Sequence, residues 1–525
     1  MNHVGQVFRE EDTGRTAPEG QPAQTLIAPD DAHNRALVRN VHPPAWVNPT
    51  PSDRYNLVVL GAGTAGLVSA AGAAGLGAKV ALVEKHLMGG DCLNFGCVPS
   101  KGLLRAARTA FAVREAETFG IRTGDSVRFD FAAAMARMRR LRAGISRNDS
   151  AHRLSKLGVD VFLGEATFVG SDAVEVGGQT LRFSRAVIAT GARPTGLPIR
   201  GLADVGFLTN ETVFSLTELP RRLVVIGAGP IGCELAQAFR RFGSDVCVVS
   251  RDPTLLPRED ADAAAILAAQ FEREGIHLFL KAEIRRAERQ NGGKLLVFER
   301  EGREQTAAGD EILVAVGRAP SVEGLNLKAA GVAFDEKAVK VDDHLRTSNR
   351  RIYAAGDVCS AYKFTHVADA MARIALQNAL FFGRKKASAL VIPWCTYTDP
   401  EVAHVGLYEK QARDRGLDFT TFSVPLSEVD RAVLDGDDVG FARIHAEKKS
   451  GRILGATLVA RHAGEMIAEM SLAITAGVGL ETIAKTIHPY PTEAEAWKRL
   501  ADAWNRTRLT PRFRTLFERY LRWRR

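Results

Sequence analysis

Cysteine is scarce, and the chain has no long hydrophobic segment. Six cysteines in 525 residues are too few for a disulfide scaffold, and their scatter is typical of a reducing compartment. The sequence has no run of 18 apolar residues, so we expect no transmembrane helix. It also lacks the charged, apolar and small-residue pattern of a secretory signal at its start, which favours a cytoplasmic location. The composition, 46% hydrophobic and 25% charged, is that of a multidomain globular protein.

Acidic residues are nearly absent from the end of the chain. Residues 505–525 hold eight arginines and one acid, Glu518, so this tail carries +7 of the net charge of +9. The remainder is close to neutral, and we therefore expect no nucleic-acid binding. Apolar residues recur in the tail at helical spacing, which predicts a basic amphipathic helix that meets a membrane surface or an acidic partner. We therefore have two expectations for this helix: it attaches the protein peripherally to the inner face of a membrane, or it packs in a dimer.

Two dinucleotide-binding units are predicted from glycine fingerprints. An apolar strand, 56–60, leads into Gly61-Ala62-Gly63-Thr64-Ala65-Gly66, and a helix and the strand 79–84 follow. The same order recurs with the strand 222–226, Gly227-Ala228-Gly229-Pro230-Ile231-Gly232 and the strand 245–249. Strand, glycine turn and helix in this order are the context that the fingerprint requires, because the turn must bring a pyrophosphate to a helix N-terminus.

In each unit, the residue at the end of the strand after the helix indicates which nucleotide is bound. Glu84 can accept hydrogen bonds from both hydroxyls of an adenosine ribose, which favours FAD or NAD at the first unit. In the second unit Ser250 takes the acid's place and Arg251 follows. A guanidinium favours a 2′-phosphate, so we expect NADPH there, with Arg258 as a weaker second candidate.

Cys92 and Cys97 are separated by four residues in a motif that ends Pro99-Ser100-Lys101. This spacing allows a disulfide across the first turn of a helix, and a helix N-terminus with Lys101 on the same face can lower a thiol pKa. Zinc is the competing interpretation, but no second cysteine pair or histidine set follows at ligand spacing. We expect no structural metal, and Lys101 is expected to pair with Glu234 from the second unit.

The chain is predicted to be α/β, with two doubly wound Rossmann-like domains and a C-terminal α+β domain. The predicted divisions are an extended or disordered lead at 1–50, a first nucleotide domain at 51–200 and 317–389, a second at 201–316, an α+β domain at 390–504 and the basic tail at 505–525.

With these residues in place, the chain resembles the class I, FAD-dependent pyridine nucleotide–disulfide oxidoreductases over about residues 54–500. The resemblance implies electron flow from NADPH through FAD to the Cys92/Cys97 disulfide, and a homodimer formed by the α+β domain. It implies that Cys97 lies against the flavin, that Cys92 meets substrate, and that Lys101 and Glu234 form an ion pair beside the flavin. The cofactor-binding residues that it implies are Gly61, Gly63, Thr64, Ala65, Gly66, Glu84, Lys101, Thr190, Gly191 and Asp357 for FAD, and Gly227, Gly229, Gly232, Arg251 and Gly317 for NADPH.

One departure from the family pattern concerns the acid/base residue. Disulfide-reducing members carry a histidine that here aligns with Tyr490, ahead of Pro491, Thr492 and Glu495, while His488 falls two residues earlier. A tyrosine has a pKa near 10 and is a poor base at neutral pH. Tyrosine at this place is similar to the mercuric-reductase branch, although this chain has neither that branch's N-terminal Cys-x-x-Cys module nor its terminal cysteine pair.

These features support three hypotheses. The leading one is an NADPH-dependent flavoprotein that reduces a soft metal ion such as Hg(II), bound transiently at Cys92 and Cys97, or another thiol-reactive oxidant. The second is a reductase of small or protein disulfides in which His488 serves as the base. The third, from a different class, is a membrane-tethered flavin electron carrier. In the first two, Cys92, Tyr490 and Glu495 are the residues expected to meet the substrate, and the sequence does not identify the oxidant.

Overall fold

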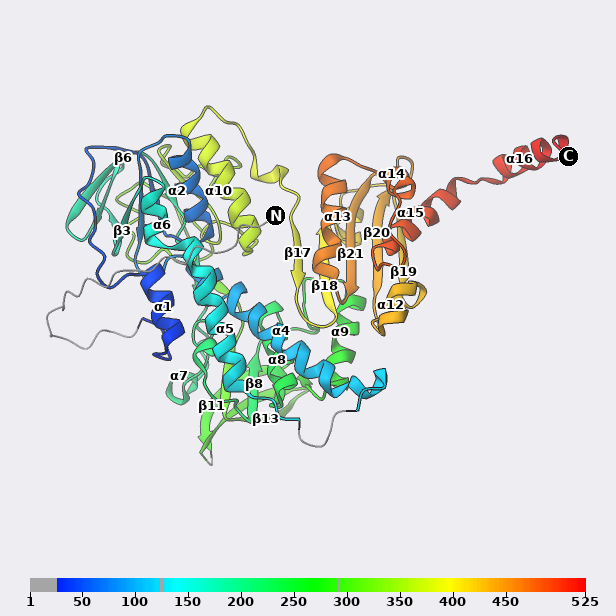
Figure 1. Ribbon diagram of the computed structural model, residues 1–525, viewed down its shortest axis with the longest axis horizontal. Coiled ribbons are helices and arrows are strands. Elements are labelled where there is room, and N and C mark those ends of the chain that lie inside the picture. The colour runs from blue at the N-terminus through cyan, green and yellow to red at the C-terminus, as the bar shows by residue number, and fades with distance from the viewer. Residues whose placement is uncertain (1–25, 123–126, 291) are drawn as a thin grey trace, which may run out of the picture.

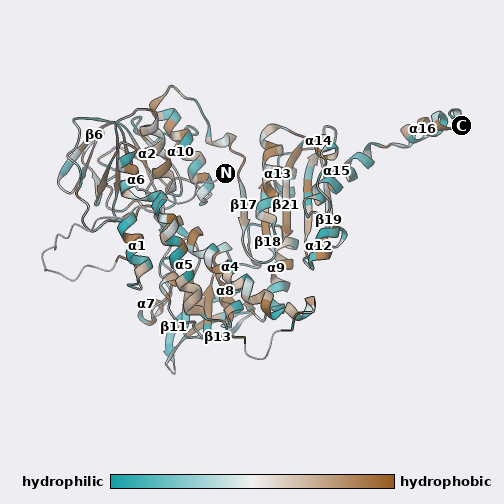
Figure 2. Cartoon of the chain, in the orientation of Figure 1, coloured by the Kyte–Doolittle hydropathy of each residue, from teal (hydrophilic) through white to brown (hydrophobic). Residues whose placement is uncertain are grey.

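The structure is a computed structural model that describes residues 26–122, 127–290 and 292–525. Figure 1 shows three α/β bodies, with a final helix projecting from the third. In Figure 2 the strand β21 (Ile453–Ala460) of the third body is largely hydrophobic, whereas β11 (Glu283–Gln290) of the second is largely hydrophilic. The predicted fold class is confirmed. Among the described residues, no helix has the length and apolar character needed to cross a membrane.

The first domain is built on a seven-stranded sheet. Its strands are β1 (Tyr55–Leu60), β2 (Val80–Glu84), β3 (Val159–Leu163), β4 (Ala166–Phe168), β5 (Ala173–Val176), β6 (Gln179–Ile188) and β16 (Ile352–Ala354), and its helices are α2 (Thr64–Gly75), α3 (Gly90–Asn94), α4 (Cys97–Arg114), α5 (Phe131–Ile145), α6 (Ala151–Lys156) and α10 (Thr365–Leu380). The strand order is β3-β2-β1-β6-β5-β4, with β16 also paired to β6, and β1, β2, β3, β6 and β16 are parallel. Residues 57–60 of β1 are all buried, as expected for a parallel strand covered on both faces.

The second domain holds a parallel sheet of order β10-β9-β8-β14 and a three-stranded antiparallel sheet, β11-β12-β13. Its elements are α7 (Leu202–Val205), β8 (Arg222–Ile226), α8 (Pro230–Phe242), β9 (Asp245–Val249), α9 (Ala261–Arg273), β10 (His277–Phe279), β11 (Glu283–Gln290), β12 (Gly293–Arg300), β13 (Arg303–Gly309) and β14 (Glu311–Val314). Where the chain leaves and re-enters the first domain, β7 (Ala192–Pro194) and β15 (Arg318–Pro320) pair antiparallel. This short ladder holds the two crossing segments together.

The third domain is a five-stranded antiparallel sheet of order β17-β18-β21-β20-β19, packed with helices. Its elements are β17 (Pro393–Thr396), β18 (Glu401–Gly406), α11 (Glu409–Asp414), β19 (Phe419–Pro425), α12 (Asp430–Asp435), β20 (Phe441–Glu447), β21 (Ile453–Ala460), α13 (Ala463–Ala476), α14 (Leu480–Lys485) and α15 (Glu495–Arg508). Trp497 on α15 is fully buried in this core. The last helix, α16 (Pro511–Trp523), has no buried residue.

The expectation of an extended or disordered lead is wrong for residues 26–50, whereas residues 1–25 lie outside the described residues. A helix, α1 (Ala32–Val41), is capped by the side chain of Asp31 and buries Leu37 and Val41 completely in the core of the first domain. Downstream, Asn48 bonds both the N–H and the C=O of Leu163, which lies on the sheet-edge strand β3. This segment therefore covers an edge that would otherwise present unpaired backbone groups.

Candidate active site

A cavity of about 1870 Å³ is lined by residues of all three domains. It is larger than the roughly 300–1,000 Å³ of an ordinary ligand pocket, so it can hold more than one extended ligand. Most of the predicted site residues line it, which brings together segments far apart in the sequence. They are Gly61, Gly63, Thr64, Ala65, Glu84, Cys92, Cys97, Lys101, Thr190, Gly191, Gly227, Gly229, Glu234, Arg251, Gly317 and Asp357.

The first glycine turn leaves no room for a side chain at Gly61 or at Gly66. Gly61 has a φ of +96°, and a Cβ there would lie 2.5 Å from the backbone oxygen of Ala189. A Cβ on Gly66 would lie 1.8 Å from the oxygen of Gly61, so this glycine lets α2 pack closely on the turn and does not itself line the cavity. A turn free of side chains at the start of a helix fits a pyrophosphate, because the helix N–H groups then face the anion.

Three further residues complete the cradle around the first site. At the end of β2, Glu84 accepts hydrogen bonds from the N–H groups of Ala62 at 2.7 Å and His86 at 2.8 Å. Burial raises the pKa of Glu84, and these two hydrogen bonds oppose that rise. Thr190 donates to the carbonyl of Ser321 at 2.7 Å, which fixes the adjoining Gly191 turn. These residues fit a flavin nucleotide at this position.

Asp357 faces the same cavity from the segment that follows β16. Its carboxylate lies 3.5 Å from the guanidinium of Arg318, which also pairs with Asp91 at 2.9 Å. Burial raises the pKa of Asp357, and Arg318 acts in the opposite direction. The carboxylate is therefore held in place while one side of it faces the cavity.

The second glycine turn repeats the geometry of the first. Gly227 has a φ of +111°, and a Cβ there would lie 2.5 Å from the oxygen of Ala315. Gly232 is the packing glycine of this turn, since a Cβ on it would lie 2.2 Å from the oxygen of Gly227. Ser250 is buried and donates to Asp252 at 3.0 Å, whereas Arg251 is exposed at the cavity rim. Among the described residues, no carboxylate lies within ion-pair distance of Arg251, so its guanidinium is free to meet an anion.

Cys92 and Cys97 are both free thiols in the structure. Cys92 lies within α3, and Cys97 is the first residue of α4, whose N-terminal N–H groups favour a negative charge. The hydrogen bond from Cys92 is the largest of the influences that lower the pKa of Cys97 to about 6, and Lys101 contributes as well. The same hydrogen bond raises the pKa of Cys92. The reduced pair is therefore a thiolate at Cys97 beside a thiol at Cys92.

The predicted pair of Lys101 and Glu234 is present, with 2.7 Å between Nζ and Oε2. Burial by itself would lower the pKa of Lys101, but Glu234 outweighs burial and the pKa is raised. The other carboxylate oxygen of Glu234 accepts from the N–H of Tyr397 at 2.9 Å, and the Tyr397 ring lies 4.6 Å from Lys101 Nζ. Tyr397 was not predicted, because no local motif marks it.

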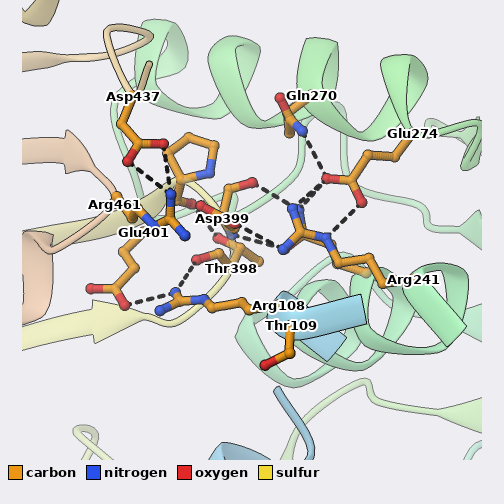
Figure 3. A network of polar contacts seen from close by, with 12 residues as sticks. Arg108, Thr109, Arg241, Gln270, Glu274, Thr398, Asp399, Glu401, Asp437 and Arg461 are labelled. Carbon is orange, nitrogen blue, oxygen red and sulfur yellow. Dashed lines mark hydrogen bonds and ion pairs between the residues drawn. The ribbon is translucent and has the colours of Figure 1, made fainter. Parts of the chain in front are cut away.

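Figure 3 shows a network of polar contacts around Thr398 and Asp399, the two residues that follow Tyr397 in the chain. Arg241 on α8 pairs with Glu274 at 2.7 Å and with Asp399 at 2.8 Å, and it stacks on the Phe111 ring at 4.0 Å. Arg241 is 2% exposed, so its charge is compensated almost entirely by these two carboxylates. The network joins α8, the helix that bears Glu234, to the third domain. It therefore fixes the position of the Lys101–Glu234 ion pair relative to the two cysteines.

A second unpredicted contact reaches the segment between the two cysteines, at the end of α3. Arg142 on α5 is 1% exposed and donates to the carbonyl of Asn94 at 2.6 Å and to the side chain of Asn34, on α1, at 2.7 Å. Burial lowers the pKa of Arg142 to about 10. The N-terminal helix is therefore part of the support of the redox centre.

Tyr490 and Glu495 do not line the cavity that contains Cys92. The Tyr490 side chain is 69% exposed on the third domain, and its hydroxyl donates to Asp430 at 2.9 Å. This hydrogen bond raises the pKa of Tyr490. Glu495 lies 3.4 Å from Arg499, and His488 lies 3.1 Å from Glu469. Within one chain the structure does not bring these residues to the cysteines, so they reach a redox centre only if a second subunit supplies it.

Comparisons with known proteins match the whole arrangement. Residues 55–372 match the family model described as pyridine nucleotide-disulphide oxidoreductase, and residues 392–501 match the dimerisation domain of that family. A mercuric reductase of Lysinibacillus sphaericus is 36% identical over 447 residues, covering 85% of this chain and 82% of the relative. A dihydrolipoyl dehydrogenase of Geobacillus stearothermophilus is 34% identical, covering 83% of this chain and 93% of the relative.

The solved structures that it resembles include a Cu(II) complex of the HOCl-induced flavoprotein disulfide reductase RclA from Escherichia coli. That structure has a TM-score of 0.77 and 29% sequence identity, covering 86% of this chain and all of the other. LpdA from Mycobacterium tuberculosis has a TM-score of 0.78 and 28% identity, covering 86% of this chain and 99% of the other.

Proposed function

Because the chain belongs to the pyridine nucleotide-disulphide oxidoreductase family, we propose that it reduces a soft metal ion or another thiol-reactive oxidant with electrons from NADPH. Members of this family are FAD-dependent and use NAD(P)H, so the protein is a flavoprotein oxidoreductase. The matched dimerisation domain supports a homodimer. The choice of NADPH over NADH and the identity of the oxidant are our inferences.

The protein's own residues account for the first half-reaction. FAD, when bound, supplies a two-electron acceptor between the nicotinamide and the cysteines. In the net reaction NADPH gives up a hydride, the Cys92–Cys97 disulfide bond breaks, and one thiol and one thiolate form with no further proton. A hydride is equivalent to one proton and two electrons, and that proton is the one that Cys92 keeps. Lys101 and the N-terminus of α4 stabilise the thiolate of Cys97. In the second half-reaction the Cys92 thiol and the Cys97 thiolate pass two electrons to the oxidant. The disulfide re-forms and the proton is released.

The hydroxyl of Tyr490 is the observation that favours a metal ion or similar oxidant over a disulfide. A disulfide substrate leaves as two thiolates, which need a proton donor near neutral pH. Tyr490 donates to Asp430 and has a raised pKa, so it is a neutral group that is poorly suited to exchange a proton at pH 7. A metal ion needs no such proton. The Cu(II) complex of a related flavoprotein is consistent with this class of oxidant.

The test is NADPH oxidation by the FAD-loaded homodimer with Hg(II) or Cu(II) in excess thiol, compared with oxidised glutathione and lipoamide. Turnover with a metal ion, and little with either disulfide, is the expected result. A disulfide reductase is the second candidate, favoured by the contact of His488 with Glu469. Turnover only with a disulfide, lost in His488→Ala, would replace our proposal with that one.

The low pKa of Cys97 predicts a specific pH dependence. In the reduced enzyme the rate of iodoacetamide alkylation at Cys97 should be high above pH 6 and fall as the pH drops through about 6, because the reactive thiolate is protonated there. An ordinary thiol titrates near 8.5. Lys101→Met should move the midpoint upward, because it removes a nearby cation. A midpoint of 8 or above in the unaltered enzyme would contradict the thiolate assignment.

We further infer that the basic segment 505–525 brings the enzyme to an acidic surface. Its apolar side chains are exposed on α16, and its arginines give it a charge opposite to that of such a surface. The chemistry of that surface is the subject of the next inference.

A further inference from the structure

The last helix begins with its own start signals and stands apart from the third domain. The side chain of Thr510 accepts from the N–H of Phe513, and Pro511 occupies the first turn of α16. Just before it, α15 is docked, with Trp504 buried and Arg508 stacked on the Trp504 ring at 4.8 Å. Only Leu509 and Thr510 separate the two helices, and Figure 1 shows α16 projecting outward from α15.

The apolar side chains of α16 lie on one face and are uncovered. From Phe513 they recur at intervals of three and four residues, and each is between 48% and 80% exposed; they are Phe513, Leu516, Phe517, Tyr520, Leu521 and Trp523. Arg522 lies on the opposite side of the helix, and Arg512 and Arg519 flank the apolar face. Figure 2 shows hydrophobic and hydrophilic residues alternating along α16.

A helix of this length is marginal in water without a surface to cover its apolar face. Pairing with the α16 of a second copy is unfavourable, since each segment 505–525 carries a net charge of +7 and Arg524, at the C-terminal cap of α16, falls in line with the apolar stripe. An anionic bilayer matches both faces, because arginines bind lipid phosphates while aromatic and leucine side chains enter the acyl boundary. We propose that α16 lies in the headgroup region of an anionic membrane and holds the reductase there.

The homodimer carries two such helices. If both reach the same bilayer, the second contact is intramolecular and strengthens attachment without any new kind of contact. Membrane attachment is independent of which oxidant the enzyme reduces, because it uses no residue of the redox cavity. Vesicle binding is also measured without turnover, so its failure would leave the proposed reductase function untouched.

The test is sedimentation of the FAD-loaded homodimer with vesicles of phosphatidylcholine alone or with about a quarter phosphatidylglycerol. The unaltered protein should sediment with the anionic vesicles and not with the neutral ones. Added salt should weaken its binding to the anionic vesicles. Two variants add the same charge on opposite faces: Phe517→Glu on the apolar face and Thr515→Glu on the polar face. Thr515→Glu should weaken binding about fivefold through charge. Phe517→Glu should weaken it at least about tenfold more, because it also removes a buried ring.

Both variants should oxidise NADPH with a soluble electron acceptor at the unaltered rate, which shows that the redox centre is intact. Equal weakening by the two substitutions would overturn the proposal, since it would mean charge attraction without insertion. Absence of binding to anionic vesicles would overturn it as well. Tighter binding to soluble polyglutamate than to vesicles would replace the lipid surface with an acidic protein.

Discussion

Cys97→Ser should reduce turnover with the physiological oxidant by at least about 100-fold, the scale expected when a covalent redox group is removed. Serine cannot form the disulfide, so electrons have no route from the cofactor to Cys92. Cys97 also begins α4 and has the pKa of about 6 that makes it the thiolate of the pair. Reduction of the bound flavin by NADPH in a single turnover should persist, because the second glycine turn, where we expect NADPH to bind, does not include Cys97.

The control is Cys247→Ser, which changes a half-buried cysteine on β9 that does not line the cavity. It should leave both flavin reduction and turnover within about twofold, as expected for a site without a role in the chemistry. Cys92→Ser should match Cys97→Ser in steady-state turnover. If Cys97→Ser retained turnover with Hg(II), Cu(II) and the disulfides alike, the cysteine pair would not be the route to the oxidant. The membrane-tethered electron carrier would then become the better hypothesis.

The parts of the site that could be predicted from the sequence are those that a motif of contiguous residues specifies. A strand, a glycine turn and a helix specify their own geometry, so the turns at Gly61 and Gly227 were predicted from local pattern, and the structure adds their positive φ angles. The cysteine motif likewise placed Cys97 at the start of a helix. The pairing of Lys101 with Glu234, 133 positions apart, was expected from the cysteine motif and is also implied by the family resemblance, and it is present at 2.7 Å.

The parts that could not be predicted depend on contacts between distant segments. Arg241 meets Asp399 across 158 positions, and Tyr397 reaches Glu234 through a backbone N–H that no side-chain motif encodes. The residues that fix the ion pair therefore appear in the sequence as an ordinary arginine and a loop aspartate. Only the packing of α8 against the third domain makes them neighbours.

The N-terminal segment was misjudged for a related reason. Its prolines and polar residues suggested a chain without structure, and α1 is only ten residues long. Such a helix is unstable alone and forms because Leu37 and Val41 are buried against the first domain. Arg142 then uses Asn34 as a partner, so a segment outside the family match at 55–372 supports the end of α3, between the two cysteines.

Arg251→Ala should lower kcat/KM for NADPH by roughly 10- to 150-fold and leave that for NADH nearly unchanged. A charge-assisted hydrogen bond contributes about 1.5–3 kcal/mol, and each 1.36 kcal/mol is a factor of ten in kcat/KM. Arg251 follows β9 at the cavity rim, where the adenosine ribose of a nucleotide bound at the second glycine turn would lie. Only NADPH carries a 2′-phosphate there, so only NADPH should lose binding.

Arg221→Ala is the matched control, because Arg221 is an exposed arginine just before β8, at the opposite end of the same parallel sheet. It should leave both coenzymes unaffected. Arg258→Ala tests the second candidate, since Arg258 lines the same cavity and should show a smaller effect of the same sign. An unaltered enzyme that uses NADH as well as NADPH, with Arg251→Ala lowering both equally, would show that Arg251 does not read the 2′-phosphate.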